Sequence, residues 1–171
     1  MRFLNMKYIL ASLLIVAIVS TPLSARKRTK TETTGDVLQI TIPVAALITA
    51  FSKDDTEGMK QLAYSVAAST AATWALKFAV HKKRPRGGKY AFPSAHTSLA
   101  FTGSTFLGMR YGYAYGVPSA AAASYVGYSR VQVRRHDWTD VIGGALVGGI
   151  SSYIFTTTHD QNKAEKPNRS K

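Results

Sequence analysis

Uncharged, mostly apolar segments alternate with short polar ones along the chain, and this alternation sets the expected elements. Six uncharged or nearly uncharged segments follow one another, at 8–20, 37–52, 61–80, 97–109, 116–129 and 141–157. Their lengths and their alanine and leucine content favour helices, and no alternating strand pattern persists in them. Pro43 is expected to kink the second segment or to end it early. The sequence therefore predicts an all-α bundle of about five to six helices.

The glycine spacing of the last segment, VIGGALVGGISSYIFTT (141–157), bears on where this bundle resides. In a soluble helix each glycine would cost about 1 kcal/mol. In a membrane helix, small residues four apart allow two helices to approach closely. The segment 61–80 is also apolar almost all round and carries one charge, Lys77. We expect a multi-pass transmembrane helical bundle, with a soluble helical bundle as the alternative, because serine, threonine and glycine keep the segments only moderately hydrophobic.

The first 25 residues have the features of a signal peptide or of a first transmembrane helix. Arg2 and Lys7 precede an uncharged run that is short for a bilayer span and about right for a signal core. Both interpretations place the residues after this segment outside the cytoplasm. The expected organisation is 1–25 as signal peptide or first helix, 26–35 as polar linker, 36–157 as helical domain and 158–171 as polar basic tail.

The excess of positive charge limits which binding partners are expected. The chain has 22 lysines and arginines against 9 aspartates and glutamates, a formal net charge of +13. This balance suits nucleic acid, an anionic membrane surface or a phosphorylated substrate. Nucleic acid is disfavoured, since no basic face with interleaved aromatics and no nucleic-acid-binding module is recognisable. The absence of cysteine excludes disulfide and thiolate chemistry.

Two polar clusters flank the start of the fourth predicted helix. The first, KFAVHKKRPRGGK (77–89), places Lys77 and Arg84 seven residues apart, two helical turns along one face. The second, FPSAHTS, places Ser94 and His96 at a helix start, where free backbone N–H groups bind anions. Taken singly, the first cluster is typical of an interfacial basic cap and the second of an ordinary helix cap.

A third cluster, SRVQVRRHDWTD (129–140), opens the last helix and contains Arg130. His136 and Asp140 are four apart, so a carboxylate lies beside an imidazole and can hold one tautomer. A helix cap with a salt bridge would explain this pair alone. In the six-helix arrangement, however, all three clusters fall on the same face. Together they hold two histidines, a carboxylate and several cations, the groups needed to transfer a phosphoryl group through a covalent histidine intermediate.

These clusters resemble the motifs of the type 2 phosphatidic acid phosphatases, a superfamily that includes bacterial class A acid phosphatases and vanadium haloperoxidases. The family pattern is Lys-x6-Arg-Pro, then Pro-Ser-Gly-His, then Ser-Arg-x5-His-x3-Asp. The chain has every fixed position in the same order and spacing, except that Ala95 replaces the glycine. The resemblance covers residues 61–157.

The resemblance implies a role for each matching residue. It makes His136 the nucleophile that is phosphorylated, Asp140 the residue that orients it and His96 the acid that protonates the leaving oxygen. It implies a phosphate-binding group made of Lys77, Arg84, Ser94, Ala95 through its amide, and Arg130. No metal or other cofactor is implied, and a bell-shaped pH profile is expected because His136 must be neutral and His96 charged. Ala95 is tolerable at a negative φ and awkward where glycine's freedom is required.

We therefore expect a multi-pass phosphatase of the cell (inner) membrane, with its active site facing the periplasm or the cell exterior. Its substrate is expected to be a lipid phosphate or pyrophosphate, hydrolysed without metal through a phosphohistidine. Undecaprenyl pyrophosphate, phosphatidylglycerol phosphate and lipid A phosphate are equally compatible with these residues. The expected partners are this substrate and membrane lipids, not nucleic acid. The alternatives are a secreted soluble acid phosphatase and a membrane relative impaired by Ala95.

Overall fold

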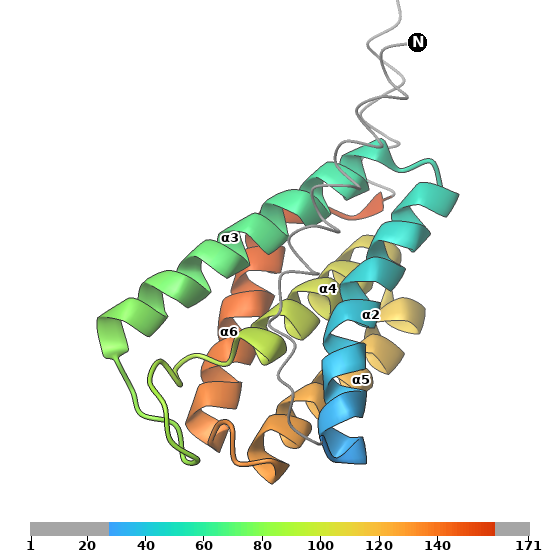
Figure 1. The fold of residues 1–171 in the computed structure, drawn as a ribbon. Helices are drawn as coiled ribbons and strands as arrows, with labels where there is room; N and C mark the ends of the chain where they lie inside the picture. Colours follow the sequence, from blue (N-terminus) through green and yellow to red (C-terminus); the bar gives the residue numbers. More distant parts are fainter. Residues whose placement is uncertain (1–27, 160–171) are drawn as a thin grey trace, which may run out of the picture.

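The computed structural model describes residues 28–159, which form a bundle of five α-helices (Figure 1). The helices are α2 (Lys30–Ser52), α3 (Thr56–Val80), α4 (Ala95–Tyr111), α5 (Tyr113–Gln132) and α6 (Trp138–Phe155). No strand occurs among the described residues, and the predicted all-α bundle is confirmed. The expected signal peptide or first helix (1–25) and the tail from residue 160 onward lie outside the described residues.

Helix α2 departs most from the sequence-based expectation. It begins at Lys30, so most of the segment 26–35, expected to be a polar linker, forms its first turns. The Thr29 hydroxyl caps this start by accepting a hydrogen bond from the Glu32 N–H at 3.1 Å. The helix also continues through Pro43 instead of ending there. The polar first turns of α2 are therefore part of the folded bundle.

Helix α4 occupies the centre of the bundle and packs against all four other described helices. Its contact with α6 is close because two glycines of α6 face it. A Cβ atom added at Gly144 would lie 2.5 Å from the Ser94 carbonyl oxygen, and one at Gly148 would collide with the Ser98 carbonyl oxygen. The glycine-rich stretch thus permits the close helix approach that its spacing predicted.

Buried apolar side chains form two clusters around α4. The first joins α2, α3 and α4 through Ala46, Leu62, Val66, Phe106 and Leu107. The second joins α2, α4 and α5 through Ile42, Ala100, Ala123 and Val126. These clusters fix how the helix ends are placed, and the residues of interest lie at those ends.

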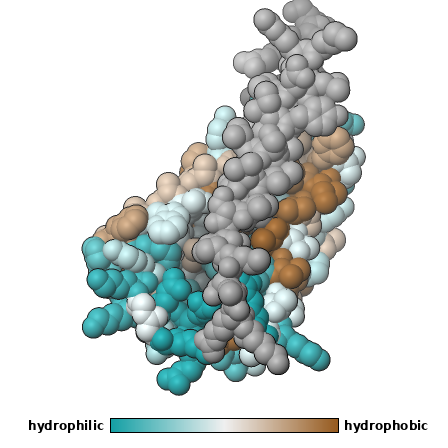
Figure 2. Space-filling view, in the orientation of Figure 1, coloured by the Kyte–Doolittle hydropathy of each residue, from teal (hydrophilic) through white to brown (hydrophobic). Residues whose placement is uncertain are grey.

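Large apolar side chains also cover outer faces of the bundle. Trp74 and Phe78 of α3 and Ile142, Leu146 and Ile150 of α6 are each more than half exposed. In Figure 2, hydrophilic residues gather at the lower end of the molecule, whereas hydrophobic ones lie along its right side. Among the described helices, α2 alone is long and apolar enough to cross a membrane. Exposed apolar surface on this scale indicates contact with a membrane or another protein.

Candidate functional site

The three polar clusters meet at one end of the bundle. The ends of α3 and α5 and the starts of α2, α4 and α6 lie together there (Figure 1). Backbone contacts join them, because the Ser94 N–H donates to the Asp140 carbonyl oxygen at 2.9 Å and the His136 N–H donates to the Arg130 carbonyl oxygen. The residues brought to this end include every predicted site residue: Lys77, Arg84, Ser94, Ala95, His96, Arg130, His136 and Asp140.

His136 and Asp140 form the pair that their spacing predicts. His136 Nδ1 lies 3.3 Å from Asp140 Oδ2, and both side chains are buried. The carboxylate of Asp140 is held further by the Asp137 N–H at 3.2 Å and by Lys82 Nζ at 2.8 Å. The other ring nitrogen of His136, Nε2, has no hydrogen-bond partner within residues 28–159. The pair therefore presents one oriented, unoccupied imidazole nitrogen.

The surroundings of His136 favour its neutral form. Burial lowers its pKa, and the nearby cations Arg84 and Lys77 lower it further, against the opposing effect of Asp140. The ordinary pKa of a histidine is about 6.5, so this imidazole is unprotonated at neutral pH. A neutral imidazole has the free electron pair that a nucleophile needs.

Two cations lie beside His136. Lys77 is buried in the last turn of α3 and donates to the carbonyl oxygens of Tyr90 at 2.9 Å and Pro93 at 2.7 Å. Arg84 follows in the α3–α4 loop, and its buried Nε has no acceptor in the described part of the chain. Burial lowers the pKa of Arg84, as does the charge of Arg135. A half-buried guanidinium whose Nε lacks an acceptor is suited to binding an anion.

The start of α4 supplies uncharged donors. Ser94 caps the helix, and its hydroxyl oxygen accepts from Thr97 N at 3.4 Å and from Thr97 Oγ1 at 3.0 Å. Within the described residues, the N–H groups of Ala95 and His96 have no acceptor, as is usual in a first helical turn. Ala95 has a negative φ, so the conformation does not require the glycine of the family pattern.

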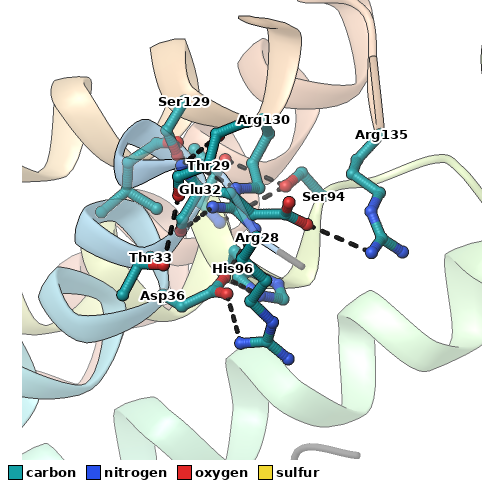
Figure 3. A network of polar contacts seen from close by, with 12 residues as sticks. Arg28, Thr29, Glu32, Thr33, Asp36, Ser94, His96, Ser129, Arg130 and Arg135 are labelled. Atoms are coloured by element: carbon teal, nitrogen blue, oxygen red, sulfur yellow. Dashed lines mark hydrogen bonds and ion pairs between the residues drawn. The ribbon is translucent and has the colours of Figure 1, made fainter. Parts of the chain in front are cut away.

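Arg130 is buried, and most of its hydrogen-bond partners come from α2. Its Nη1 donates to Asp36 Oδ1 at 2.6 Å, its Nη2 to the Glu32 carbonyl oxygen at 2.9 Å and its Nε to Ser129 Oγ at 3.0 Å (Figure 3). His96 Nε2 lies 3.2 Å from the same oxygen of Asp36. Helix α2, which carries no residue of the predicted site, therefore completes its wall.

Three charged residues of this end are not predicted by any motif in the sequence. Asp36 also pairs with Arg28 at 2.7 Å, and Glu32 pairs with Arg135 at 3.1 Å. Lys82 pairs with the carboxylates of Asp137 and Asp140. Glu32 and Asp36 are four residues apart, and would have been expected on one helical face had the segment been recognised as helix. Lys82 lies within the first polar cluster but outside any family position, so no signal marked it.

A cavity of about 570 Å³ opens beside the site, between the start of α2, the α3–α4 loop and the α5–α6 turn. Its lining includes Thr31, Glu32, Arg86, Gln132 and Arg134. This polar and basic lining suits an anionic or hydroxyl-bearing group attached to the phosphate.

Comparisons with known proteins agree with this geometry. The chain matches the PAP2 superfamily over residues 86–164. The lipid A 4'-phosphatase of Helicobacter pylori (strain J99 / ATCC 700824) is 26% identical over 140 residues, 75% of this chain and 70% of the relative. Dolichyldiphosphatase 1 of Callithrix jacchus is 27% identical over 110 residues, 48% of this chain and 46% of that relative. The chain thus spans about half the length of the second relative.

A solved structure shows the same fold. LpxE of Aquifex aeolicus superimposes with a TM-score of 0.63 at 21% sequence identity, covering 84% of this chain and 92% of that chain. The all-helical architecture expected from the sequence is therefore also the architecture of this solved structure. The match to the PAP2 superfamily over residues 86–164 confirms the resemblance that the three motifs predicted.

Proposed function

We propose that this protein is a membrane phosphatase that hydrolyses a lipid phosphate or pyrophosphate through a phosphohistidine formed on His136, without a metal. One observation carries the proposal. The buried His136–Asp140 pair presents a free Nε2 next to Lys77 and to Arg84, a guanidinium with an unused buried donor. A nucleophile oriented by a carboxylate and faced by cations is the arrangement that phosphoryl transfer requires.

The reaction proceeds in two steps. His136 Nε2 attacks the phosphorus, the bond from phosphorus to the leaving oxygen breaks, and His96 gives that oxygen a proton. Asp140 accepts the hydrogen bond of Nδ1 and stabilises the charge that develops on the ring. Water then attacks the phosphohistidine, His96 takes the proton of the water, and the electron pair of the phosphorus–nitrogen bond returns to Nε2. Inorganic phosphate leaves and the enzyme is restored.

Cations and N–H groups neutralise the phosphoryl oxygens during both steps. Lys77, Arg84 and Arg130 supply charge, while the Ser94 hydroxyl and the Ala95 N–H supply hydrogen bonds. Such preorganised donors stabilise the charge that develops in the transition state. They do here what a metal ion does in other phosphoryl-transfer enzymes.

The distribution of apolar surface supports the proposal that the protein lies in a membrane, with the site at one end of the bundle. The faces of α3 and α6 expose large apolar side chains along their lengths, whereas the helix ends that carry the site lie at the lower end, where hydrophilic residues gather (Figures 1 and 2). A lipid can thus lie along the apolar faces while its phosphate enters the polar end. We place the protein in the inner membrane, with the site on the periplasmic or external side. Lipid A and dolichyl diphosphate, named in the two relatives, head the substrate panel.

Phosphate release in detergent with EDTA tests this function on a panel of lipid phosphates and pyrophosphates. His136→Ala should lower kcat by about a thousandfold or more and His96→Ala by about a hundredfold. His81→Asn, at the exposed C-cap of α3, is the matched histidine control and should keep wild-type activity. The acid limb of kcat/KM should lie below about pH 6.5, because His136 must be neutral and its pKa is lowered. Activity that needs metal or survives His136→Ala would contradict the proposal.

A secreted soluble acid phosphatase is the second candidate. It is supported by the observation that, of the helices within residues 28–159, α2 alone meets the length and hydropathy of a membrane span. Fractionation separates the two. A membrane phosphatase stays in the membrane pellet after a high-salt wash and is released by detergent, whereas the soluble enzyme appears in the supernatant.

A further inference from the structure

A carboxylate from α2 reaches into the site although no motif predicts it. Asp36 Oδ1 lies 2.6 Å from Arg130 Nη1 and 3.2 Å from His96 Nε2, while its Oδ2 lies 2.7 Å from Arg28 Nη1 (Figure 3). The Asp36 side chain is only 17% exposed. One oxygen atom thus contacts both the proposed general acid and a proposed phosphate-binding arginine.

The other charged groups that act on His96 are positive. Arg84 from the α3–α4 loop and Arg130 from α5 both interact electrostatically with its ring. Burial and the neighbouring cations both disfavour a protonated imidazole, and an opposite charge within about 4–6 Å acts against them. Asp36 provides that charge. A general acid must carry its proton before the leaving group departs, so His96 depends on Asp36 for its role.

The charged groups of the remaining helices act on the other histidine. On α6, Asp140 bonds His136 Nδ1, and on α3, Lys77 interacts with the same ring. Asp36 is therefore the carboxylate that the bundle directs at His96.

The two histidines are held by opposite ring nitrogens. Asp140 contacts Nδ1 of His136 and leaves its Nε2 open, whereas Asp36 contacts Nε2 of His96. Within residues 28–159, Nδ1 of His96 has no hydrogen-bond partner. A carboxylate on one ring nitrogen sets which nitrogen carries the proton and how the ring is turned. For His96 this arrangement leaves Nδ1 as the ring nitrogen available for proton transfer.

We propose that Asp36 is a positioning residue that holds His96 by its Nε2–H, so that Nδ1 delivers the proton to the leaving oxygen. This inference rests on the proposed function. As the bond from phosphorus to the leaving oxygen breaks, its electron pair stays on that oxygen and the Nδ1 proton joins it, while Asp36 remains ionised. The same carboxylate holds Arg130, whose guanidinium has five N–H groups and keeps donors for the phosphate beyond its three hydrogen bonds within the bundle.

Asp36→Asn tests the inference through its dependence on the leaving group. The substitution keeps the size of the side chain and removes its charge. For an alkyl phosphate, whose alkoxide leaves poorly without a proton, kcat should fall about thirtyfold. For p-nitrophenyl phosphate, whose phenolate leaves readily, kcat should change less than about threefold. Any loss that arises through Arg130 should affect both substrates equally and appear mainly in KM.

Glu32→Gln is the matched control. Glu32 lies one helical turn before Asp36 and its carboxylate pairs with Arg135, not with His96. In this variant, kcat relative to the wild type should change by the same factor for both substrates. Equal losses for both substrates in Asp36→Asn would overturn the inference. So would a gain of activity with tighter inhibition by inorganic phosphate, because it would mean that Asp36 merely occupies the phosphate position.

Nitrogen NMR of histidine-labelled wild-type protein gives a readout that does not depend on turnover or on the folding of a variant at Asp36. The His96 signals are assigned by their absence in His96→Gln. At neutral pH Nε2 should carry a proton that is hydrogen-bonded to a carboxylate. An unprotonated Nε2 would overturn the inference even in an active enzyme. A protonated Nε2 in a protein that releases no phosphate would keep the Asp36–His96 contact and reject the proposed function alone.

Discussion

Two buried aspartate–arginine networks lie at opposite ends of the bundle, and they differ in how completely their donors are used. At the α2–α3 turn, Asp55 accepts Arg110 Nε at 2.7 Å and Arg110 Nη2 at 2.5 Å. The Gly58 N–H at 2.9 Å and the Tyr111 hydroxyl at 2.8 Å also donate to it, and His159 Nδ1 lies 3.3 Å from its Oδ2. Burial would raise the pKa of Asp55, yet these bonds lower it to about 2.

The network around Asp36 and Arg130 is open by contrast. The same end of the bundle holds the unpartnered Arg84 Nε, the Ala95 N–H and His136 Nε2 within the described residues. A buried carboxylate surrounded by donors rigidifies the fold, whereas leftover donors favour a ligand that supplies acceptors. The comparison indicates that the Asp55 end stabilises the bundle and the Asp36 end binds an anion.

The largest effect on stability is expected from Asp55→Asn. The substitution leaves the buried guanidinium of Arg110 without its counter-charge, so the free energy of unfolding should fall by about 3 kcal/mol. Denaturation in detergent measures it. Asp54→Asn, at the exposed neighbouring position, is the control and should change this free energy by less than about 0.5 kcal/mol.

The activity of Asp55→Asn gives a second test of the difference between the two ends. Below its unfolding temperature, Asp55→Asn should retain the wild-type dependence on the leaving group, because Asp55 lies at the end remote from His96. A stability unchanged by the substitution, or a selective loss on alkyl phosphates, would remove the distinction between the two ends.

The smallest effect is expected from Ala95→Gly. Ala95 begins α4 with a negative φ, so the family glycine would gain no conformational advantage there. Phosphate release should change less than about threefold, and the free energy of unfolding should fall by less than about 1 kcal/mol. Steady-state kinetics and denaturation of the variant check both values. A large gain in kcat would show that the methyl group impairs the natural chain.

Much of the fold follows from the hydrophobic pattern. The segments predicted at 61–80, 97–109 and 116–129 lie within α3, α4 and α5, because apolar runs of this length bury themselves as helices. The predicted start of α2 was wrong, because the polar residues of its first turns have the composition of a linker. In the structure, ion pairs to Arg130 and Arg135 hold these turns against the bundle. Tertiary contacts of this kind leave no periodic signal in the sequence.

The candidate site also has a part that the sequence predicts and a part that it does not. The motif positions were predictable because the proposed chemistry needs a histidine, a carboxylate and cations at fixed spacings within single segments. Asp36 and Lys82 were not, since each meets its partner only through the fold. Asp36 is separated from Arg130 by 94 positions, and Lys82 from Asp140 by 58. No local spacing links residues that far apart.

Capture of the covalent intermediate tests the central claim most directly. The enzyme is mixed with substrate labelled in the transferred phosphate and quenched in alkali, in which a phosphohistidine survives. We expect label on His136 in the wild-type protein, lost on exposure to acid and absent from His136→Ala. Turnover by the wild type without label on the protein, or with label on another residue, would contradict the claim.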